Sequence, residues 1–507
     1  MNKDQTYDLF VIGGGINGCG IARDAAGRGL SVYLCEKDDL AQGTSSSSTK
    51  LIHGGLRYLE HYEFRLVRES LIEREVLLKN APHIIWPLRF VLPHKKDMRP
   101  AWMLRLGLFI YDHLGGREIL PGASSVDLRN DEAGDPLHVH FKKAFEYSDC
   151  WVDDARFVVL NAIDAKRLGA VIQTRTKCIS TRRDGNIWIV EVEDQQSGKV
   201  TEIKAKYLVN ASGPWVQNVM EDCNLSFSDE GVRLVRGSHI IVPKLYDHER
   251  AYIFQNEDGR IFFSIPYEND FTLIGTTDED HKGEVNGVEI STDEIAYLCK
   301  SAESYFTKKI TPADVVWSYS GVRPLYDDGA SEAQEATRDY VLKDHGDVNN
   351  APVLNIFGGK ITTYRKLSEA ALLKIAPYFP HIKPAWTKDA PLPGGEFDVS
   401  TVNEKIEQLR KEFSYLDKAW ATRLVRMYGL RAWEILDQKH KKEDLGIDFG
   451  ATLTETEVMF MINEEWATSV EDILWRRSKL GLHMTNAQKS ILEEKVKTFL
   501  DAKQSAA

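Results

Sequence analysis

The sequence predicts an α/β protein with a nucleotide-binding parallel sheet assembled from separated segments, an inserted antiparallel sheet and a C-terminal helical domain. Three observations support this prediction. A glycine-rich turn follows the first apolar strand, strand–glycine segments recur twice further along, and the pattern from Thr401 onward is helical. At 507 residues the chain is too long for one hydrophobic core, so we expect two to three domains.

The chain opens with the order strand, turn, helix, strand and acid, which is typical of a dinucleotide-binding unit. We expect a buried strand over Tyr7–Ile12, a turn over Gly13–Gly18, a helix that includes Ile21–Ala26, and a second strand over Ser31–Cys35. Glu36 ends that strand, close to the expected distance of about 20 residues from the turn.

Each part of this unit has a mechanical reason. Gly13 permits the tight turn, Gly15 lets backbone N–H groups approach a pyrophosphate, and Gly18 lets the helix pack on the sheet. The helix N-terminus offers unpaired donors to the phosphates. Glu36 can accept hydrogen bonds from the adenosine ribose and would repel a 2′-phosphate, so FAD or NAD is expected rather than NADP.

Further elements follow from the periodicity of apolar residues. The nucleotide-binding part is expected to continue with helix Phe64–Leu78, helix Phe157–Leu168, strands at Val171-Ile172 and Thr174–Cys178, an antiparallel ribbon of Ile187–Val192 and Lys199–Ala205, a strand over Tyr207–Gly213, a strand over Leu354–Phe357 and a helix from about Tyr364. Short strands at hairpin spacing predict the separate antiparallel sheet, at His239–Val242, Ala251–Gln255, Arg260–Ile265 and Phe271–Ile274.

The C-terminal segment shows signals for helix starts. Capping boxes are predicted at Thr401/Glu404, Thr454/Glu457 and Ser469/Asp472, the first ahead of an apolar face formed by Val402, Ile406, Leu409 and Phe413. The predicted domains are a nucleotide-binding domain in residues 1–80, 151–225 and 331–385, a cap or substrate domain in 81–150 and 226–330, and a helical domain in 386–507.

Composition excludes several classes of protein. The net charge of −12 argues against binding of nucleic acid, whose phosphates need a basic face. The six cysteines are scattered without a CxxC pair, and no histidine has ligand spacing with other donors, so we expect reduced thiols and no metal site. We expect neither a signal peptide nor a membrane-spanning helix, because no apolar run approaches about 20 residues.

The run of hydroxyl residues from Thr44 to Ser48, followed by Lys50–Tyr58, favours FAD over NAD. The ribityl chain and isoalloxazine ring of a flavin need further hydroxyl and backbone donors beyond the ribose acid, whereas NAD does not. Lys360 and the N–H groups of Ile361 and Thr362 open a helix and could stabilise negative charge on the reduced flavin.

Four stretches resemble signatures of the FAD-dependent, respiratory glycerol-3-phosphate dehydrogenases, and the likeness to their bacterial aerobic members covers essentially the whole chain. These stretches are Ser45–Leu66, Tyr147–Arg156, Tyr319–Leu325 and Gly358–Lys366. The resemblance implies a fold like that of D-amino acid oxidase and FAD as cofactor. It further implies oxidation of sn-glycerol 3-phosphate to dihydroxyacetone phosphate by hydride transfer from C2 to the flavin, with a membrane quinone as acceptor, a cytoplasmic location peripheral to the membrane, and a homodimer.

The substrate is a small dianion, for which Arg57, Arg323 and Lys360 are the predicted catalytic cations, with the Tyr58 hydroxyl beside them. The alternative for any one arginine is a structural ion pair with a carboxylate. The C2 hydroxyl proton needs an acceptor, and a neutral histidine is the usual one near pH 7. His239 is our choice, on the substrate side by resemblance, with His53 as the other candidate and an ordinary strand histidine as the alternative.

The cofactor contacts expected from the motifs and the resemblance are Gly13, Gly15, Ile16, Asn17, Gly18, Glu36, Lys37, Thr44, Ser45, Ser46, Leu51, His53, Gly54, Cys178, Ala211, Gly213, Trp215, Gly359, Lys360 and Thr362. Residues 99–121 are apolar enough to insert into a membrane surface and carry Arg99, Arg105 and Arg117, although an ordinary buried helix remains the alternative. Two rival functions remain open: an oxidase that passes electrons to oxygen, and a redox-silent flavin-binding scaffold.

Overall fold

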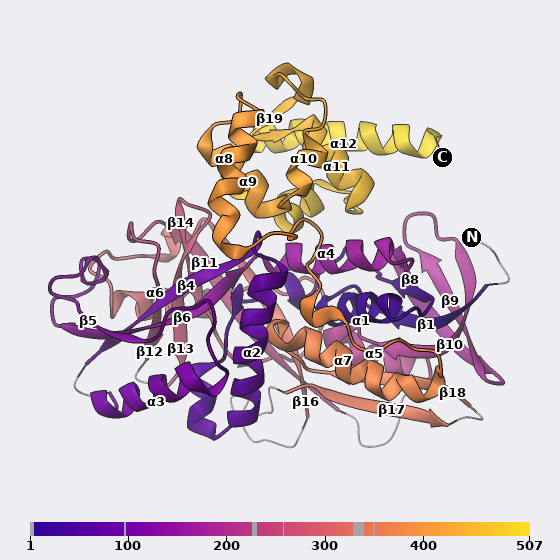
Figure 1. Ribbon diagram of the computed structural model, residues 1–507, viewed down its shortest axis with the longest axis horizontal. Coiled ribbons are helices and arrows are strands. Elements are labelled where there is room, and N and C mark those ends of the chain that lie inside the picture. Colours follow the sequence, from indigo (N-terminus) through magenta and orange to yellow (C-terminus); the bar gives the residue numbers. More distant parts are fainter. Residues whose placement is uncertain are drawn as a thin grey trace.

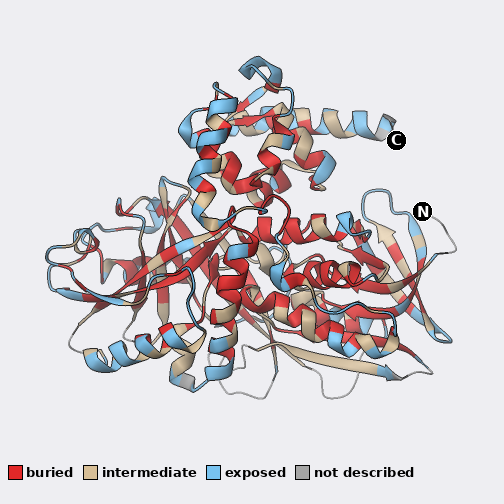
Figure 2. Ribbon diagram, in the orientation of Figure 1, coloured by how far each residue is buried: buried red, intermediate tan, exposed pale blue. Residues whose placement is uncertain are grey.

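Two large sheets and a helical C-terminal unit make up the computed structural model (Figure 1). The structure describes residues 5–95, 98–225, 231–256, 258–327, 339–347 and 350–506. Buried residues concentrate in the two sheets and in the helices against them, as Figure 2 shows. The fold therefore has the predicted α/β class, with an antiparallel sheet and a helical C-terminal part.

The first sheet has a parallel centre, in the order β18, β10, β1, β2 and β7. Their bounds are Asn350–Phe357, Val200–Asn210, Thr6–Ile12, Val32–Cys35 and Val171–Gln173, and β17 (Val341–Asp347) adds an antiparallel edge. The three predicted strand–glycine segments are thus the neighbours β1, β10 and β18. Because they run parallel, their glycine-containing ends meet at one edge of the sheet.

The second strand of the predicted ribbon and the strand predicted after it form a single long strand, β10, rather than two. Its first half pairs antiparallel with β9 (Ile187–Asp194), which pairs in turn with β8 (Thr176–Asp184). Its second half pairs parallel with β1. Lys206 is a surface residue at the junction, which gave the sequence pattern its apparent break.

Helices cover both faces of this sheet. The helices α1 (Ile16–Gly27), α4 (Asp154–Arg167) and α7 (Tyr364–Ile375) share one apolar core on one face, and α5 (Val216–Asp222) packs into the core on the other. The approach of α1 to α7 requires a glycine, since a Cβ at Gly20 would lie 2.6 Å from the Tyr364 ring. These positions confirm the three predicted helices.

The second sheet is antiparallel except where β12 meets β4. Its main order is β15 (Glu279–Asp280), β11 (Val232–Pro243), β14 (Phe271–Gly275), β13 (Ile261–Tyr267), β12 (Ala251–Gln255), β4 (Ile85–His94), β6 (Lys143–Val152) and β3 (Leu51–Ile52), with β16 (Trp317–Tyr326) on β11 and β5 (Ser124–Asp127) on β6. The predicted hairpin strands are confirmed. Helix α6 (Thr292–Glu303) packs into the core on one face, and α2 (Phe64–Asn80) and α3 (Ala101–Leu114) pack into the core on the other.

The C-terminal part contains α8 (Val402–Glu412), α9 (Lys418–Tyr428), α10 (Arg431–Ile435), α11 (Glu455–Glu464), α12 (Asn486–Ala506) and a hairpin of β19 (Asp448–Gly450) and β20 (Leu453–Thr454). The predicted apolar face of α8 is buried. The capping box at Ser469/Asp472 is confirmed, because each backbone N–H donates to the other side chain at 3.1 Å.

The other two predicted capping boxes are wrong, because neither Thr401 nor Thr454 makes a side-chain cap. A short 3-10 turn precedes α8, and Asp398 caps that turn instead. The Glu457 carboxylate is held by Arg423 and by the Tyr428 hydroxyl, which is 2.9 Å away, so it does not reach back to its own helix start.

Across the described ranges, no helix combines the length and the hydropathy that crossing a membrane requires. All six cysteines carry free thiols and are buried. In that same part of the chain no group of acidic, histidine and cysteine side chains is arranged to hold a metal ion.

Candidate active site

A cavity of about 1000 Å³ lies where the ends of β1, β10 and β18 face the second sheet. Each of the three predicted strand–glycine segments contributes to its wall, at Gly13, at Ala211 to Gly213 and at Gly358 to Thr362. The hydroxyl-rich loop from Thr44 to Thr49 and strand β16 supply further lining. The sequence motifs are therefore brought together in one continuous site.

The glycine turn has the geometry that its sequence predicts. Gly13 has a φ of +109°, and a Cβ there would lie 2.6 Å from the Ala211 carbonyl oxygen. A Cβ at Gly18 would lie 1.9 Å from the Gly13 oxygen, so Gly18 permits the close packing of helix and turn. No side chain caps α1 at Gly15, which leaves the helix start directed at the cavity, apart from a 3.0 Å bond from the Ile16 N–H to Ser45 Oγ.

Glu36 lies beside this turn in the cavity wall. Its carboxylate accepts hydrogen bonds from the N–H groups of Gly14 (2.7 Å) and Asp38 (2.8 Å). Burial raises its pKa from the ordinary 4.5 to about 7, partly offset by these two bonds. Beside it, Lys37 Nζ lies 4.2 Å from the centre of the Trp215 ring.

FAD affinity is expected to fall about tenfold between pH 8 and pH 6. Glu36 without the cofactor has a pKa of about 7, and ribose hydroxyls that donate to the carboxylate would lower it, so binding releases a proton and is favoured at higher pH. Titration of the apoprotein with FAD, followed by fluorescence quenching, measures this at both pH values. The Glu36→Gln variant should bind more weakly and show a flat profile, and a wild-type profile without slope would contradict the expectation.

The loop from Thr44 to Lys50 is fixed from behind by a buried ion pair that the sequence did not reveal. Lys50 Nζ lies 2.8 and 2.9 Å from the two carboxylate oxygens of Asp154 at the start of α4, and both side chains are almost fully buried. The Ser48 hydroxyl donates to the same carboxylate at 2.7 Å. Lys50 and Asp154 both fall within the stretches that carried the family resemblance, which was the one signal in the sequence that pointed to these two residues.

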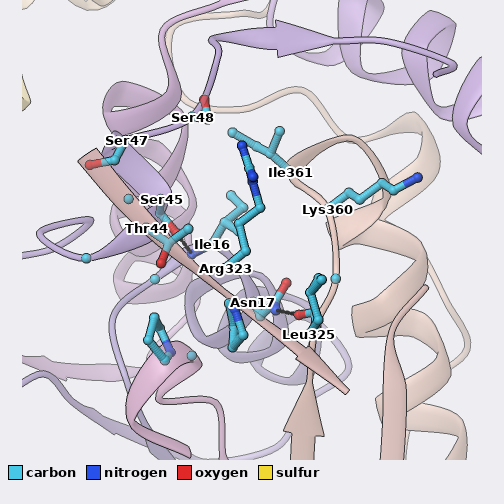
Figure 3. Close-up of a pocket in the computed structure, with 18 of the residues that line it drawn as sticks. Ile16, Asn17, Thr44, Ser45, Ser47, Ser48, Arg323, Leu325, Lys360 and Ile361 are labelled. Atoms are coloured by element: carbon cyan, nitrogen blue, oxygen red, sulfur yellow. Dashed lines mark hydrogen bonds between the residues drawn. The ribbon is translucent and has the colours of Figure 1, made fainter. Parts of the chain in front are cut away.

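Arg323 projects from β16 into the cavity. In Figure 3 it lies between the hydroxyl residues Thr44 to Ser48 on one side and Lys360 on the other. Its guanidinium pairs with the Asp278 carboxylate and donates to Thr276 Oγ1 at 3.1 Å, so the ion-pair alternative describes this structure. Pairing and substrate contact are compatible, because the side chain is 26% exposed and still lines the cavity.

Lys360, Arg57 and Tyr58 line the same cavity. Lys360 Nζ lies 3.7 Å from the centre of the Tyr58 ring, and its side chain extends away from Arg323 (Figure 3). Thr362 Oγ1 accepts the backbone N–H of His53 at 3.2 Å, which ties the third glycine segment to the flavin loop. Three cations thus face one cavity, as the sequence predicted.

His239 is absent from the described residues that line the cavity. It is 1% exposed, stacks on Tyr319 at 4.8 Å, and its Nε2 lies 3.0 Å from the hydroxyl of Thr49, which does line the cavity. Burial, with Arg323 and Lys50 adding to it, lowers its pKa well below 6.5, so the ring is neutral at pH 7. His53 lines the cavity, and burial lowers its pKa as well.

Most of the predicted cofactor contacts line the cavity, with three exceptions. Gly18 packs behind the turn. The Gly54 N–H donates to the Tyr111 hydroxyl at 2.8 Å, beside the buried Arg74–Asp149 pair. The Ser46 carbonyl accepts from Lys50 Nζ at 3.0 Å. These three residues shape the site from outside it, whereas Thr49, Asp278 and Gly43 line it without having been predicted.

Known proteins resemble this chain over nearly its full length. Glycerol-3-phosphate dehydrogenase of Pseudomonas aeruginosa is 53% identical over 484 residues, which cover 96% of this chain and 94% of that protein. D-erythritol 1-phosphate dehydrogenase of Brucella abortus is 51% identical over 494 residues, 97% of this chain and 98% of that one. The crystal structure of Bacillus halodurans glycerol-3-phosphate dehydrogenase complexed with FAD has a TM-score of 0.75 at 25% identity, covering 98% and 95% of the two chains.

The family model of FAD dependent oxidoreductases matches residues 8–365, and that of the C-terminal domain of alpha-glycerophosphate oxidase matches residues 385–504. Fold and site together define an FAD-dependent oxidoreductase, whose cavity has the glycine turns, ribose acid and hydroxyl loop that suit this cofactor. Within that class, the chain belongs to the FAD-dependent glycerol-3-phosphate dehydrogenase family.

Proposed function

We propose that this protein oxidises sn-glycerol 3-phosphate to dihydroxyacetone phosphate and passes the electrons to a membrane quinone. The observation that carries the proposal is the presence of Arg57, Arg323 and Lys360 around the cavity of about 1000 Å³. A substrate with a single carboxylate would not need three cations, whereas a phosphomonoester dianion does. The names of the relatives support the same substrate.

The residues of the chain divide the work as follows. FAD, when bound, would accept the two electrons of the substrate. Arg323, on β16, is held by the Asp278 carboxylate and by Thr276 Oγ1, in a position to donate to the phosphate. Lys360 and Arg57 supply positive charge on the other side of the cavity. The C2 hydroxyl proton passes to a neutral histidine.

A four-carbon polyol phosphate is the second candidate substrate. One of the relatives is named as a D-erythritol 1-phosphate dehydrogenase, and its substrate has the same phosphate and secondary hydroxyl. The cations recognise what both molecules share, so the length of the polyol chain must be read by other residues of the cavity. The two molecules differ by one CHOH unit, and a pocket that distinguishes them by the size of one added carbon discriminates by about 10–200-fold in kcat/KM.

The decisive experiment is anaerobic mixing of the purified holoenzyme with each polyol phosphate, followed by a soluble quinone or by air. Rapid bleaching of the flavin by sn-glycerol 3-phosphate, reversed quickly by quinone and slowly by air, supports the dehydrogenase. Immediate reversal by air with peroxide formed makes the protein an oxidase. Faster bleaching by D-erythritol 1-phosphate would make that molecule the proposed substrate. No bleaching by either polyol phosphate overturns the proposal.

His239 is the proposed acceptor of the hydroxyl proton, acting through Thr49 or after a small shift of the loop, because Thr49 is its partner at the cavity wall. The His239→Gln variant should keep its flavin and lose about 10²–10⁴ in the rate of anaerobic flavin reduction. Thr49→Val should show a smaller loss of the same kind. Unchanged reduction in His239→Gln would remove this residue from the mechanism and leave His53 as the candidate.

Electron transfer to a membrane quinone requires contact with a membrane surface, and the exposed side chains of α3 support such a contact. This helix is not the ordinary buried helix of the alternative, since Trp102, Leu106 and Phe109 are 66%, 50% and 60% exposed. It lies at the lower edge of the molecule in Figure 1, and much of it is pale in Figure 2. Exposed aromatic and aliphatic side chains near Arg99 and Arg105 suit an anionic lipid interface. A cytoplasmic location and a homodimer stay predictions of the family resemblance.

Replacing Trp102 and Phe109 by serine is expected to reduce binding to vesicles that contain anionic lipid at least tenfold in a sedimentation assay, because burial of two aromatic rings in the interface is lost. Activity with a soluble quinone should persist. The matched control is Ile491→Ser, at a 52% exposed position on α12. An equal loss of vesicle binding in the α3 variant and in Ile491→Ser would show that α3 is not the specific membrane contact.

A further inference from the structure

A segment of the C-terminal domain contacts the part of the FAD domain that holds the adenosine end of the cofactor. We call residues 472–477 the clamp segment; they form the π-helical turn Asp472–Arg477. Two guanidinium nitrogens of Arg477, Nη1 and Nη2, donate to the Asp39 carboxylate at 2.9 and 2.8 Å, and Arg476 Nε donates to it at 2.6 Å. Asp39 is 1% exposed and Arg477 is fully buried.

The clamp segment holds a second loop at the same place. Its first residue, Asp472, accepts two bonds from Arg175 at 2.8 and 2.9 Å. The backbone N–H of Arg175 donates to the Asp38 carbonyl at 2.9 Å, so Arg175 joins the clamp segment to the residue beside Asp39. Five charged side chains therefore join the clamp segment to one short stretch of backbone: Asp39, Arg175, Asp472, Arg476 and Arg477.

That stretch forms the wall of the cavity on its other side. Residues 36–38 and 41–43 line the cavity, whereas Asp39 and Leu40 point behind it. The Ala41 N–H donates to the Gly14 carbonyl at 3.1 Å, and the Asp38 N–H donates to Glu36. The positions of the glycine turn and of the ribose acid are thus coupled to a loop that Asp39 and its arginines anchor on the far side.

We propose that the clamp segment positions this loop for the cofactor, so that Asp39 is a positioning residue which sets the affinity for FAD without touching it. A buried carboxylate must be paired, and here both of its partners come from the C-terminal domain. The C-terminal domain is thereby a part of the cofactor site. This inference concerns FAD alone and does not rest on the identity of the substrate.

The test measures FAD binding and thermal unfolding separately. Asp39→Asn should raise the dissociation constant of FAD at least tenfold. The conservative variant Arg477→Lys keeps the charge and loses the bidentate contact, so it should raise the same constant about threefold to tenfold. The control is Glu457→Gln, which breaks the buried pair with Arg423 inside the C-terminal domain, away from the cavity wall. It should lower the thermal midpoint while leaving FAD affinity within twofold.

An unchanged dissociation constant in both clamp variants would overturn the proposal. The proposal is also overturned if Glu457→Gln weakens FAD binding as much as the clamp variants do, because the effect would then follow general stability. If Asp39→Asn does not fold, Arg477→Lys and Arg476→Lys decide the question with the same two measurements. Failure of the substrate proposal would leave all of these values unaffected, since no substrate is present.

Discussion

Arg323→Gln is expected to slow anaerobic flavin reduction by sn-glycerol 3-phosphate by a factor of ten to more than a hundred. A hydrogen bond from a charged donor is worth about 1.5–3 kcal/mol, and the site would lose the guanidinium that we propose binds the phosphate. The Asp278 carboxylate would also lose its bond to Arg323, so less of its negative charge is neutralised near a dianionic substrate. Stopped-flow absorbance of the flavin over a range of substrate concentrations measures both rate and affinity.

The matched control is Arg233→Gln on the neighbouring strand β11. Arg233 also pairs with a carboxylate, that of Asp280 at 2.8 Å, but it does not line the cavity among the described residues. The flavin of the Arg233→Gln variant should be reduced at the wild-type rate. Loss of bound flavin in Arg323→Gln, or an equal slowing in the control, would show that the effect arises from the sheet and not from the phosphate contact.

Asp154→Ala is expected to destabilise the protein by about 3–5 kcal/mol, the usual cost of removing one partner from a buried ion pair. It leaves the Lys50 ammonium buried, at 1% exposure, and removes the acceptor of the Ser48 hydroxyl. Because the same carboxylate fixes the loop from Thr44 to Lys50, FAD content should fall together with stability. Urea unfolding followed by circular dichroism, with flavin fluorescence recorded in parallel, measures both quantities.

Lys206→Met serves as the comparison, because Lys206 pairs with Asp8 at 2.8 Å at the surface and is 54% exposed. Exposed pairs contribute about 0–1 kcal/mol, so this variant should unfold close to the wild type. A small effect in Asp154→Ala would mean that water or another donor replaces the lost partner. The loop would then be held mainly by its other contacts, such as the bond from Thr44 Oγ1 to the Val322 carbonyl.

The parallel sheet and its helices could be predicted because each element carries its own local signal. Alternation of apolar residues and turn glycines marks β1, β2, β10 and β18 without reference to the rest of the chain. The short strand β3, its partner β6 and the strand β4 on the other side of β6 were not predicted as strands of the second sheet. Their place depends on pairing between distant segments, and two residues of strand give no periodicity to read.

For the site, residue types could be predicted but pairings could not. The sequence identified Arg323, yet its bond to Asp278 joins β16 to the loop between β14 and β15 and depends on how these segments pack. His239 was predicted at the substrate, whereas the structure places Thr49 at the cavity wall in front of it. The ion pair of Lys50 with Asp154 likewise forms only when α4 packs behind the loop. Such contacts are properties of tertiary packing.

The arrangement of β10 between β1 and β18 has a consequence for synthesis on the ribosome. The strands β1, β2, β7 and β10 have all been made when translation reaches residue 210, but β18 ends only at Phe357. Until then one edge of β10 has no parallel partner, and the third glycine segment of the cavity does not exist. FAD can therefore enter a complete site only late in translation, and the nascent chain must protect an open strand edge for the whole interval.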